Sequence, residues 1–464
     1  MEDSISTCNN DSDCPDHYHV ENTLVVNEKT SSQIRPSLKG EQNNRSNERT
    51  LGLRLDREKG GTHGGEKQHD TVAYDPQDRG FRRIIRNFTP SWFIITMSTG
   101  VVSILLHQLP YNGKWLQIIS VIFFVLNLVL FLLFTFISCL RYVLHPEIFP
   151  AVLRHPHQSL FIATFPVGLA TIINMTVLVC APAWGRGMAT LAWVLWWIDS
   201  LMALATCFHL TFVIMSNRRS ELEEMTALYL IPIVAVVIAA TSGCLVAGAI
   251  PNHKHRLWTL IISYIFWGIG TPLSWIILTL YFLRMTLHKP LKREVIVSLL
   301  LPIGPLGLSG FSIILLGKLA KRLFPLQGSL PNVANAGDIF YTLGFLLGLI
   351  LWSFAIVWFV VAVSMIATAG RFPFNMGWWG FIFPVGVFTL LTITIGEELE
   401  SRFFKVLSCV LTLMCVIAWL AIAGKTIQNS LLGKMFFAPC LGTDLYLTKL
   451  RKEKIDSRTP KEVV

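Results

Sequence analysis

Apolar residues gather into long runs along the chain, separated by short polar stretches. Two of the longest runs cover residues 115–140 and 339–363, and each exceeds the roughly 20 residues with which a helix crosses the hydrocarbon core of a bilayer. Reading the runs against the helix breakers between them predicts ten membrane-spanning helices. The predicted spans are residues 90–107, 115–140, 159–180, 189–215, 227–249, 257–283, 293–318, 338–366, 376–396 and 404–427.

The composition agrees with this pattern. Of the 464 residues, 52% are hydrophobic and 15% are charged, whereas a soluble domain carries about 25% charged residues. The sequence therefore predicts an all-α polytopic membrane protein. Residues 1–80 are polar and poor in aromatic side chains, so we expect a disordered cytoplasmic tail without a signal peptide. Residues 81–430 form the predicted transmembrane domain, and residues 431–464 form a cytoplasmic C-terminal tail.

Proline recurs inside the odd-numbered spans. The four-residue motif FPVG occurs in the third and ninth spans, and the variant LPIG occurs in the seventh. Irregular backbone at membrane depth is tolerated where it is buried or lines a wet cavity. We therefore expect five helical hairpins, with bent odd helices around a central pore and even helices facing lipid. Pro166, Pro232, Pro302 and Pro384 lie inside the third, fifth, seventh and ninth spans, and Pro272 is the exception in an even span.

Small, polar and kinked positions of the odd spans are the candidates for the pore lining. They are alternatively part of ordinary packing, because transmembrane helices are generally rich in glycine and proline and use small residues for close contact. No odd span carries Lys, Arg, Asp or Glu near its middle, which favours weak, fast binding and leaves the sign of the transported charge open. The candidates are Thr99, Gly100, Phe165, Pro166, Gly168, Thr171, Asn174, Pro232, Pro302, Gly304, Pro384 and Gly386.

The net charge of +10 reports membrane topology rather than nucleic-acid binding, because the Lys and Arg residues lie in short loops and tails and form no single basic face. The predicted loops carry equal numbers of these residues on the two sides, with Lys318, Lys321 and Arg322 assigned to the loop after the seventh span. The segments that flank the transmembrane domain decide between the two orientations, because basic residues precede the first span and follow the tenth. Both termini are therefore predicted to be cytoplasmic.

Two side chains within the spans are candidates for specific roles. Phe383, Gly386 and Thr389 share one face of the ninth helix, so the ring of Phe383 projects either into the pore as an apolar plug or into ordinary packing. Asp199 lies near the middle of the fourth span, where a charge costs about 2.5 to 3.5 kcal/mol on insertion scales. It is a candidate proton relay, with a structural hydrogen bond to a neighbouring helix as the alternative. His209, in the same span, is interpreted as structural.

Cysteine and histidine patterns predict no metal and no cofactor. The nine cysteines are scattered, most of them in or beside apolar spans, where Cys packs as a small hydrophobic residue. A membrane-embedded enzyme would need clustered histidines, but the pair His155 and His157 and the pair His253 and His255 fall in predicted loops on opposite sides of the membrane. We therefore expect no enzyme. A receptor is a third class of function, and ten spans without a folded cytosolic domain argue against it.

Several stretches resemble the tellurite-resistance and dicarboxylate transporter family. They are FTPSWFIITMSTG and ILLHQLPYNGKWL in and after the first span, FPVGLATIIN in the third, VLWWIDSLMA in the fourth and WWGFIFPVG in the ninth. Within this family the chain is most similar to the fungal sulfite efflux pumps, because FPVGLATIIN and LPYNGKWL are typical of that branch. STG and WWGFIFPVG are shared with malate permeases and, more loosely, with plant slow anion channels. The resemblance covers roughly residues 81–430.

The resemblance implies ten helices around a five-helix pore, assembly as a homotrimer and transport of an anion. Through the match of IFPVG, it also implies that Phe383 is the pore-blocking phenylalanine of the ninth helix. The expected function is export of sulfite or bisulfite, a small inorganic anion, across the plasma membrane, either passively or coupled to protons. The alternative is a malate or other dicarboxylate transporter, or a less selective anion channel. Malate carries two carboxylates, so a basic residue in the path would be expected for it, and none is visible.

Overall fold

The computed structural model describes residues 80–155, 157–216, 222–288, 296–370, 372–433, 435–436 and 438. These residues form helices and connecting turns and contain no strand, which confirms the predicted all-α class. The predicted N-terminal tail, apart from Gly80, and the predicted C-terminal tail from residue 439 onward lie outside the described residues.

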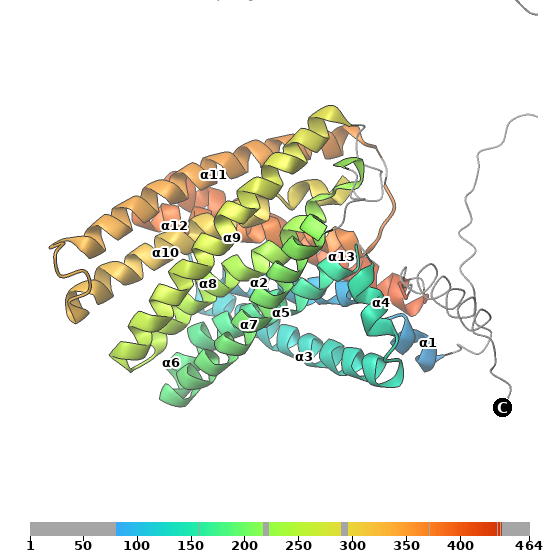
Figure 1. Cartoon of the computed structure of the whole chain (residues 1–464), viewed down its shortest axis with the longest axis horizontal. Helices are drawn as coiled ribbons and strands as arrows, with labels where there is room; N and C mark the ends of the chain where they lie inside the picture. The colour runs from blue at the N-terminus through green and yellow to red at the C-terminus, as the bar shows by residue number, and fades with distance from the viewer. Residues whose placement is uncertain are drawn as a thin grey trace, which may run out of the picture. The chain divides into compact units, whose positions relative to one another are not determined.

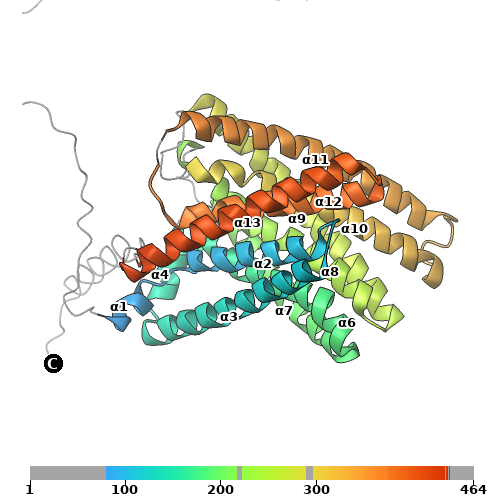
Figure 2. The same cartoon turned by 180° about the vertical axis from the view of Figure 1, so that it is seen from behind.

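Ten helical segments in this part of the chain are long and apolar enough to cross a membrane, as the hydrophobic runs predict (Figures 1 and 2). The even-numbered segments are single α-helices: α3 (Lys114–Leu144), α7 (Arg186–Ser216), α9 (His253–Leu287), α11 (Ala336–Thr368) and α13 (Arg402–Leu431). Each odd-numbered segment joins a short 3-10 segment to an α-helix: η1 (Pro90–Trp92) to α2 (Phe93–Gln108), η2 (Ser159–Ala163) to α5 (Thr164–Met175), η5 (Ala227–Leu230) to α8 (Ile231–Ala249), η6 (Ile296–Leu300) to α10 (Ile303–Gln327), and η7 (Met376–Phe381) to α12 (Ile382–Glu398).

The remaining elements are short. Helix α1 (Phe81–Arg86) precedes the first span, α4 (Ile148–Arg154) lies between the second and third, and η4 (Leu222–Glu224) precedes η5. In the third span α5 continues through a π-helical turn, η3 (Thr176–Cys180), into α6 (Ala181–Trp184). Such π-helical turns are rare and often occur at functional sites.

The odd helices lie inside the bundle and the even helices outside. In the most apolar window of each odd span, 72–94% of the residues are buried, against 28–39% in the even spans. Helices α7 and α9 cover the bundle in Figure 1, and α13 covers it from the opposite side in Figure 2. This burial agrees with the predicted division into inner and outer helices.

The five inner helices form a closed ring. Helix α2 contacts α5, α5 contacts α8, α8 contacts α10, α10 contacts α12, and α12 returns to contact α2. Each inner helix also contacts the outer helix that follows it in the chain: α3, α7, α9, α11 and α13 in turn. Whether the ring surrounds a conducting pore stays a prediction.

The prolines lie where 3-10 segments change into α-helices, not at bends in the middle of α-helices. Pro166 and Pro384 are each the third residue of their α-helix, Pro232 is the second residue of α8, and Pro302 directly precedes α10. In the first turn the N–H that proline lacks would have no helical partner anyway, so the helix accommodates it. The expected mid-helix bends are therefore corrected, and in the first span Pro90 lies at the start of η1, before the α-helix begins.

Helix α10 extends to Gln327, well beyond the predicted end of the seventh span at residue 318. Lys318, Lys321 and Arg322 consequently belong to the helix and not to a loop, which corrects their assignment. Cations are favourable near a helix C-terminus, and two of these side chains also have acidic partners. Lys318 pairs with Glu398 at the end of α12, and Lys321 Nζ lies 3.1 Å from Asp338 Oδ1 in α11. Tyr341 donates a second hydrogen bond to Glu398, so this cluster joins the ends of α10, α11 and α12.

Glycine allows a close contact between the backbones of two ring helices. A Cβ atom added to Gly307 of α10 would lie 2.8 Å from both the Cα and the backbone N of Phe388 in α12. Real Cβ atoms essentially never approach other heavy atoms so closely, and backbone atoms cannot rotate away as a side chain can. The spacing of α10 and α12 therefore depends on glycine at this position.

Candidate functional site

A small cavity of about 10 Å³ lies between the inner helices. A cavity of this size has space for about one water molecule. All five inner helices contribute to its wall, and no described residue of an outer helix does. The lining residues are Val101, Ile104 and Gln108 of α2, Thr171 and Asn174 of α5, Ile238, Thr241 and Leu245 of α8, Leu308 and Phe311 of α10, and Phe383, Val387 and Leu390 of α12.

Phe383 borders this cavity from the start of α12. Its side chain is only 2% exposed, and it takes part in no aromatic ring pair among the described residues. Phe165, which occupies the same place in the other FPVG motif, behaves differently. Its ring centroid lies 5.1 Å from that of Phe93 and 5.0 Å from that of Phe131. The two identical FPVG motifs therefore give their phenylalanines different surroundings, and of these two rings it is Phe383 that lines the cavity, together with Phe311 of α10.

The polar groups on the cavity wall are few, and the two threonines among them are already hydrogen-bonded. Thr171 Oγ1 donates to the Gly168 carbonyl at 2.7 Å and accepts from Asn127 at 3.1 Å. Thr241 Oγ1 donates to the Val237 carbonyl at 3.2 Å. Asn174 is 4% exposed, and its Oδ1 has no hydrogen-bond partner among the described residues. Its amide is therefore a polar group of the wall with bonding capacity left for a ligand.

Thr171, Asn174 and Phe383 are the predicted site residues that the structure brings together at this cavity. The candidate glycines lie instead at contacts between helices. A Cβ added to Gly100 would be 2.0 Å from Thr171 Oγ1, one on Gly168 would be 2.5 Å from Thr96 Oγ1, and one on Gly386 would be 2.9 Å from Val101. At Gly304 the nearest atom would be Pro384 Cβ, at 3.7 Å.

Thr99 faces the outer helix α13, because its hydroxyl accepts a hydrogen bond from the Trp419 indole at 3.0 Å. The candidate prolines, Pro166, Pro232, Pro302 and Pro384, lie at the 3-10 junctions described above. Sequence reasoning also missed apolar wall residues such as Val101, Ile104 and Leu308. No pattern marks them, since a helix that is buried all around shows no amphipathic face. The lining of a conducting path by the candidates stays a prediction.

Asp199 is completely buried in α7, and neither carboxylate oxygen has a hydrogen-bond partner among the described residues. The structural alternative, a hydrogen bond to a neighbouring helix, is therefore not observed there. Trp196, Ala203 and Cys207 are fully buried at helical spacing from Asp199, and the Trp196 indole donates to the Ala239 carbonyl of α8 at 2.8 Å. Asp199 thus lies on the face of α7 that packs against the inner ring, without lining the central cavity.

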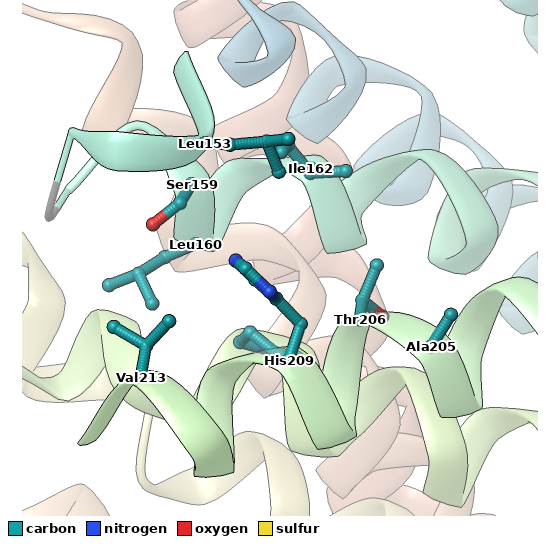
Figure 3. Close-up of a pocket in the computed structure, with 9 residues that line it drawn as sticks. Leu153, Ser159, Leu160, Ile162, Ala205, Thr206, His209 and Val213 are labelled. Atoms are coloured by element: carbon teal, nitrogen blue, oxygen red, sulfur yellow. The ribbon is translucent and has the colours of Figure 1, made fainter. Parts of the chain in front are cut away.

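A second cavity, of about 170 Å³, lies beside the ring where α4, η2, α7 and the start of α8 meet. Its lining is mostly apolar, and Figure 3 shows the imidazole of His209 pointing into it from α7. His209 is exposed, so it does not have the buried surroundings of a structural core residue. Only Pro232 comes from the inner α-helices, and the cavity therefore lies apart from the central one.

The described residues offer no site for a metal ion, since nowhere do three His, Cys, Asp or Glu side chains come together. The paired histidines have other contacts, and His253 and His255 belong to the start of α9 and not to a loop. His155 Nδ1 accepts the backbone N–H of His157 at 3.3 Å, and the His255 ring packs 4.8 Å from that of Trp193.

Comparison with known proteins agrees with this geometry. Residues 87–427 match the family described as voltage-dependent anion channel. The chain is 44% identical to a sulfite efflux pump of Arthroderma benhamiae over 352 residues, which cover 76% of this chain and 93% of the relative. It is 27% identical to the malic acid transport protein of Schizosaccharomyces pombe over 352 residues, 72% of this chain and 77% of the relative.

A further relative is a sulfite efflux pump of Saccharomyces cerevisiae, 24% identical over 390 residues that cover 72% of this chain and 85% of the relative. The family match covers the ten spans almost completely, from just before η1 to within the last turns of α13. The names of these relatives describe transporters and channels. The chain belongs to the voltage-dependent anion channel family, SLAC1, and is a multi-pass membrane protein of the anion-transporting class.

Proposed function

We propose that this chain exports sulfite or bisulfite across the plasma membrane along a path between the five inner helices, with the ring of Phe383 as its gate. The observation that carries the proposal is the cavity to which all five inner helices contribute and which Phe383 borders. A hydrophobic constriction closes a pore by excluding water, and a space for about one water suits a closed path. The similarity to named sulfite efflux pumps supports the choice of anion.

The wall of the proposed path binds its ion weakly. None of the described residues that line the cavity is charged, and Asn174 supplies an amide whose Oδ1, an acceptor, has no described partner. The N–H₂ of the same amide is the group that would donate hydrogen bonds to an oxyanion. A neutral donor holds the ion less firmly than Lys or Arg would, and conduction requires that the ion can leave again. Asn174 is therefore the proposed contact of the passing anion.

The direction of the inner helices favours an anion at the tail side. Consecutive spans alternate in direction, so all five inner helices run parallel with their N-terminal ends on the side of the N-terminus. We place that side, and both termini, in the cytoplasm. Helix N-termini carry partial positive charge, and five of them favour the approach of an anion from this side. A reporter fused to the C-terminus that is accessible only from outside the cell would contradict this orientation.

Malate is the second candidate substrate, because a malic acid transport protein is among the relatives. A dicarboxylate is best held by cations that bind its two carboxylate groups. The described wall offers no cation, and Lys318 and Lys321 at the far end of α10 face Glu398 and Asp338. These observations favour a small oxyanion over malate.

Anion flux into proteoliposomes tests the substrate. We expect the flux of sulfite to exceed that of malate, chloride and nitrate by at least about tenfold, which corresponds to ~1.4 kcal/mol between the barriers. If malate is transported faster than sulfite, the dicarboxylate assignment is correct instead.

In the same vesicles, Asn174→Leu should lower the sulfite flux by about three- to tenfold, since it removes one hydrogen bond to the ion. Thr394→Val is the control, because Thr394 is equally buried in α12 but bonds to its own helix.

We propose that Asp199 takes up a proton during transport. A carboxylate is costly to bury without a partner, so a change in the packing of α7 against α5 and α8 would be coupled to its protonation. Asp199→Asn keeps the shape and removes the titratable group, and we expect sulfite flux through this variant to lose its response to an imposed proton gradient. An unchanged response would show that Asp199 has no part in coupling.

We further propose a homotrimer as the working assembly, on the basis of the family resemblance. The apolar outer faces of α3, α9, α11 and α13 carry many exposed large side chains, and lipid and neighbouring subunits would share them. Light scattering of the protein in detergent measures the mass of the protein component, and a value for a single chain would contradict the trimer.

A further inference from the structure

The short segment that leads into Phe383 is hydrogen-bonded to two other helices. Trp379 lies in η7, four residues before Phe383, and is 1% exposed. Its backbone carbonyl accepts a hydrogen bond from Ser98 Oγ of α2 at 3.0 Å. Its indole Nε1 donates to Thr426 Oγ1 of α13, also at 3.0 Å. One residue is thereby attached to an inner helix through its backbone and to an outer helix through its side chain.

These bonds lie where the backbone ladder is weakest. The Ile382 N–H donates to the Trp379 carbonyl in the 3-10 manner as η7 changes into α12. Pro384, the third residue of α12, has no N–H and so adds no backbone hydrogen bond at the start of this helix. Phe383 lies between this proline and the 3-10 turn. The backbone hydrogen bonds therefore hold Phe383 less firmly than they hold residues in the middle of α12. Contacts from other helices determine the position of Phe383.

A second tryptophan supports the first. Trp419 of α13 packs against the Trp379 ring with centroids 6.1 Å apart and an interplanar angle of 78°. Its indole donates to Thr99 Oγ1 at 3.0 Å, one residue after Ser98. Neighbouring residues of α2 thus bond to both tryptophans, and α13 contacts the η7 segment at two positions along its length, Trp419 and Thr426.

We propose that Ser98, Trp379 and Thr426 are positioning residues that hold Phe383 against the central cavity. The inference rests on the proposed role of Phe383 as the gate and goes beyond it, because it assigns control of the gate to an outer helix that does not line the cavity. When the bonds to Trp379 are lost, η7 shifts more easily and the ring leaves the path more often. Ser98 and Thr426 act through Trp379 and do not touch the ion.

The substitution Thr426→Val tests this inference, because valine keeps the shape of threonine and removes the acceptor of the indole N–H. We expect the sulfite flux per folded protein to rise about three- to tenfold. Thr426→Ser keeps the hydroxyl and should remain within about twofold of the native flux. The matched control is Thr412→Val in the same helix, since Thr412 is 3% exposed and its hydroxyl bonds to the Ser408 carbonyl of its own helix.

The decisive measurement repeats Thr426→Val in a Phe383→Ala background. If the hydroxyl acts through the ring, its effect falls below about twofold once the ring is absent. An equal effect in both backgrounds, or an equal effect of Thr412→Val, would overturn the positioning role while leaving the gate intact. If Phe383→Ala alone leaves the flux unchanged, the gate and its positioning both fail. Ser98→Ala, which removes the bond to the Trp379 carbonyl from the other side, gives a second test should Thr426→Val fold poorly.

Discussion

Replacing Phe383 with alanine is expected to raise the sulfite flux by at least about tenfold, equivalent to lowering the barrier by ~1.4 kcal/mol. The ring is 2% exposed and borders a cavity with space for about one water. Removing it joins this cavity to the space that the ring occupied, and a wetted path has no apolar constriction left to close it. The flux of radiolabelled sulfite into proteoliposomes, normalised to folded protein, measures the effect.

The same substitution also costs packing energy, since Phe→Ala in a core typically costs about 3 to 5 kcal/mol of stability. Phe388→Ala is the matched control. Phe388 is 3% exposed in the same helix, but its ring stacks on Trp352 and Phe359 of the outer helix α11, with centroids 5.9 and 6.3 Å away. We expect a similar loss of stability from both variants and an increase in flux from Phe383→Ala alone. Equal increases would mean that loosened packing, not a removed gate, lets the ion through.

Gly307→Ala is also expected to lower the stability of the protein. The added methyl group would lie 2.8 Å from the Cα and N atoms of Phe388, so α10 and α12 must move apart along their whole contact. Overpacking typically costs about 1 to 3 kcal/mol, and we expect the upper end because no rotamer change relieves a contact with backbone. The midpoint of thermal unfolding in detergent should fall by about 5 °C or more.

Gly268→Ala in α9 is the control for this prediction. No heavy atom lies within 4 Å of a Cβ added to Gly268, and alanine is the better helix former by roughly 1 kcal/mol. The control should therefore leave the unfolding midpoint unchanged or raise it slightly. If Gly307→Ala is as stable as Gly268→Ala, the two helices are not held at the distance that the structure gives.

The number, order and burial of the spans could be predicted because they depend on quantities that sequence displays directly. A run of apolar residues long enough for a bilayer is visible as it stands, and glycine and polar residues at membrane depth indicate burial. The outer helices expose large apolar side chains, such as Phe136 and Phe212, in the manner expected for lipid contact. These features identify inner and outer helices without any knowledge of how the helices are rotated.

The residues that line the cavity could not be predicted as well, because the hydrophobic pattern of an inner helix does not show how the helix is rotated about its axis. Because Thr99 and Gly100 are polar or small, the sequence favours them as pore-lining residues, yet they face α13 and α5. The apolar Val101 and Ile104 line the cavity instead. A helix with partners on every side is apolar on every side. Polar groups in such a helix satisfy each other across helix contacts, so they mark contacts at least as often as they mark a path.

The prolines show a similar limit. Sequence places Pro166 and Pro384 well inside their spans, and bends were the natural expectation. The α-helix, however, begins later than the span, since each inner helix starts with a 3-10 segment. The point at which one helix type gives way to the other depends on bonds from distant residues, such as that of Ser98 to Trp379, 281 positions away.

The closed ring of inner helices has a consequence for biosynthesis. Its last contact joins α12 to α2, that is, the ninth span to the first. A nascent chain that has inserted eight spans therefore contains four of the five inner helices. At that stage Gly307 faces an empty groove, and Ser98 lacks the carbonyl to which it bonds. The segment that completes the wall also brings Phe383. Translation of the ninth span therefore closes the ring and adds Phe383, its proposed gate, in one step, and a chain that stops short of this span has neither.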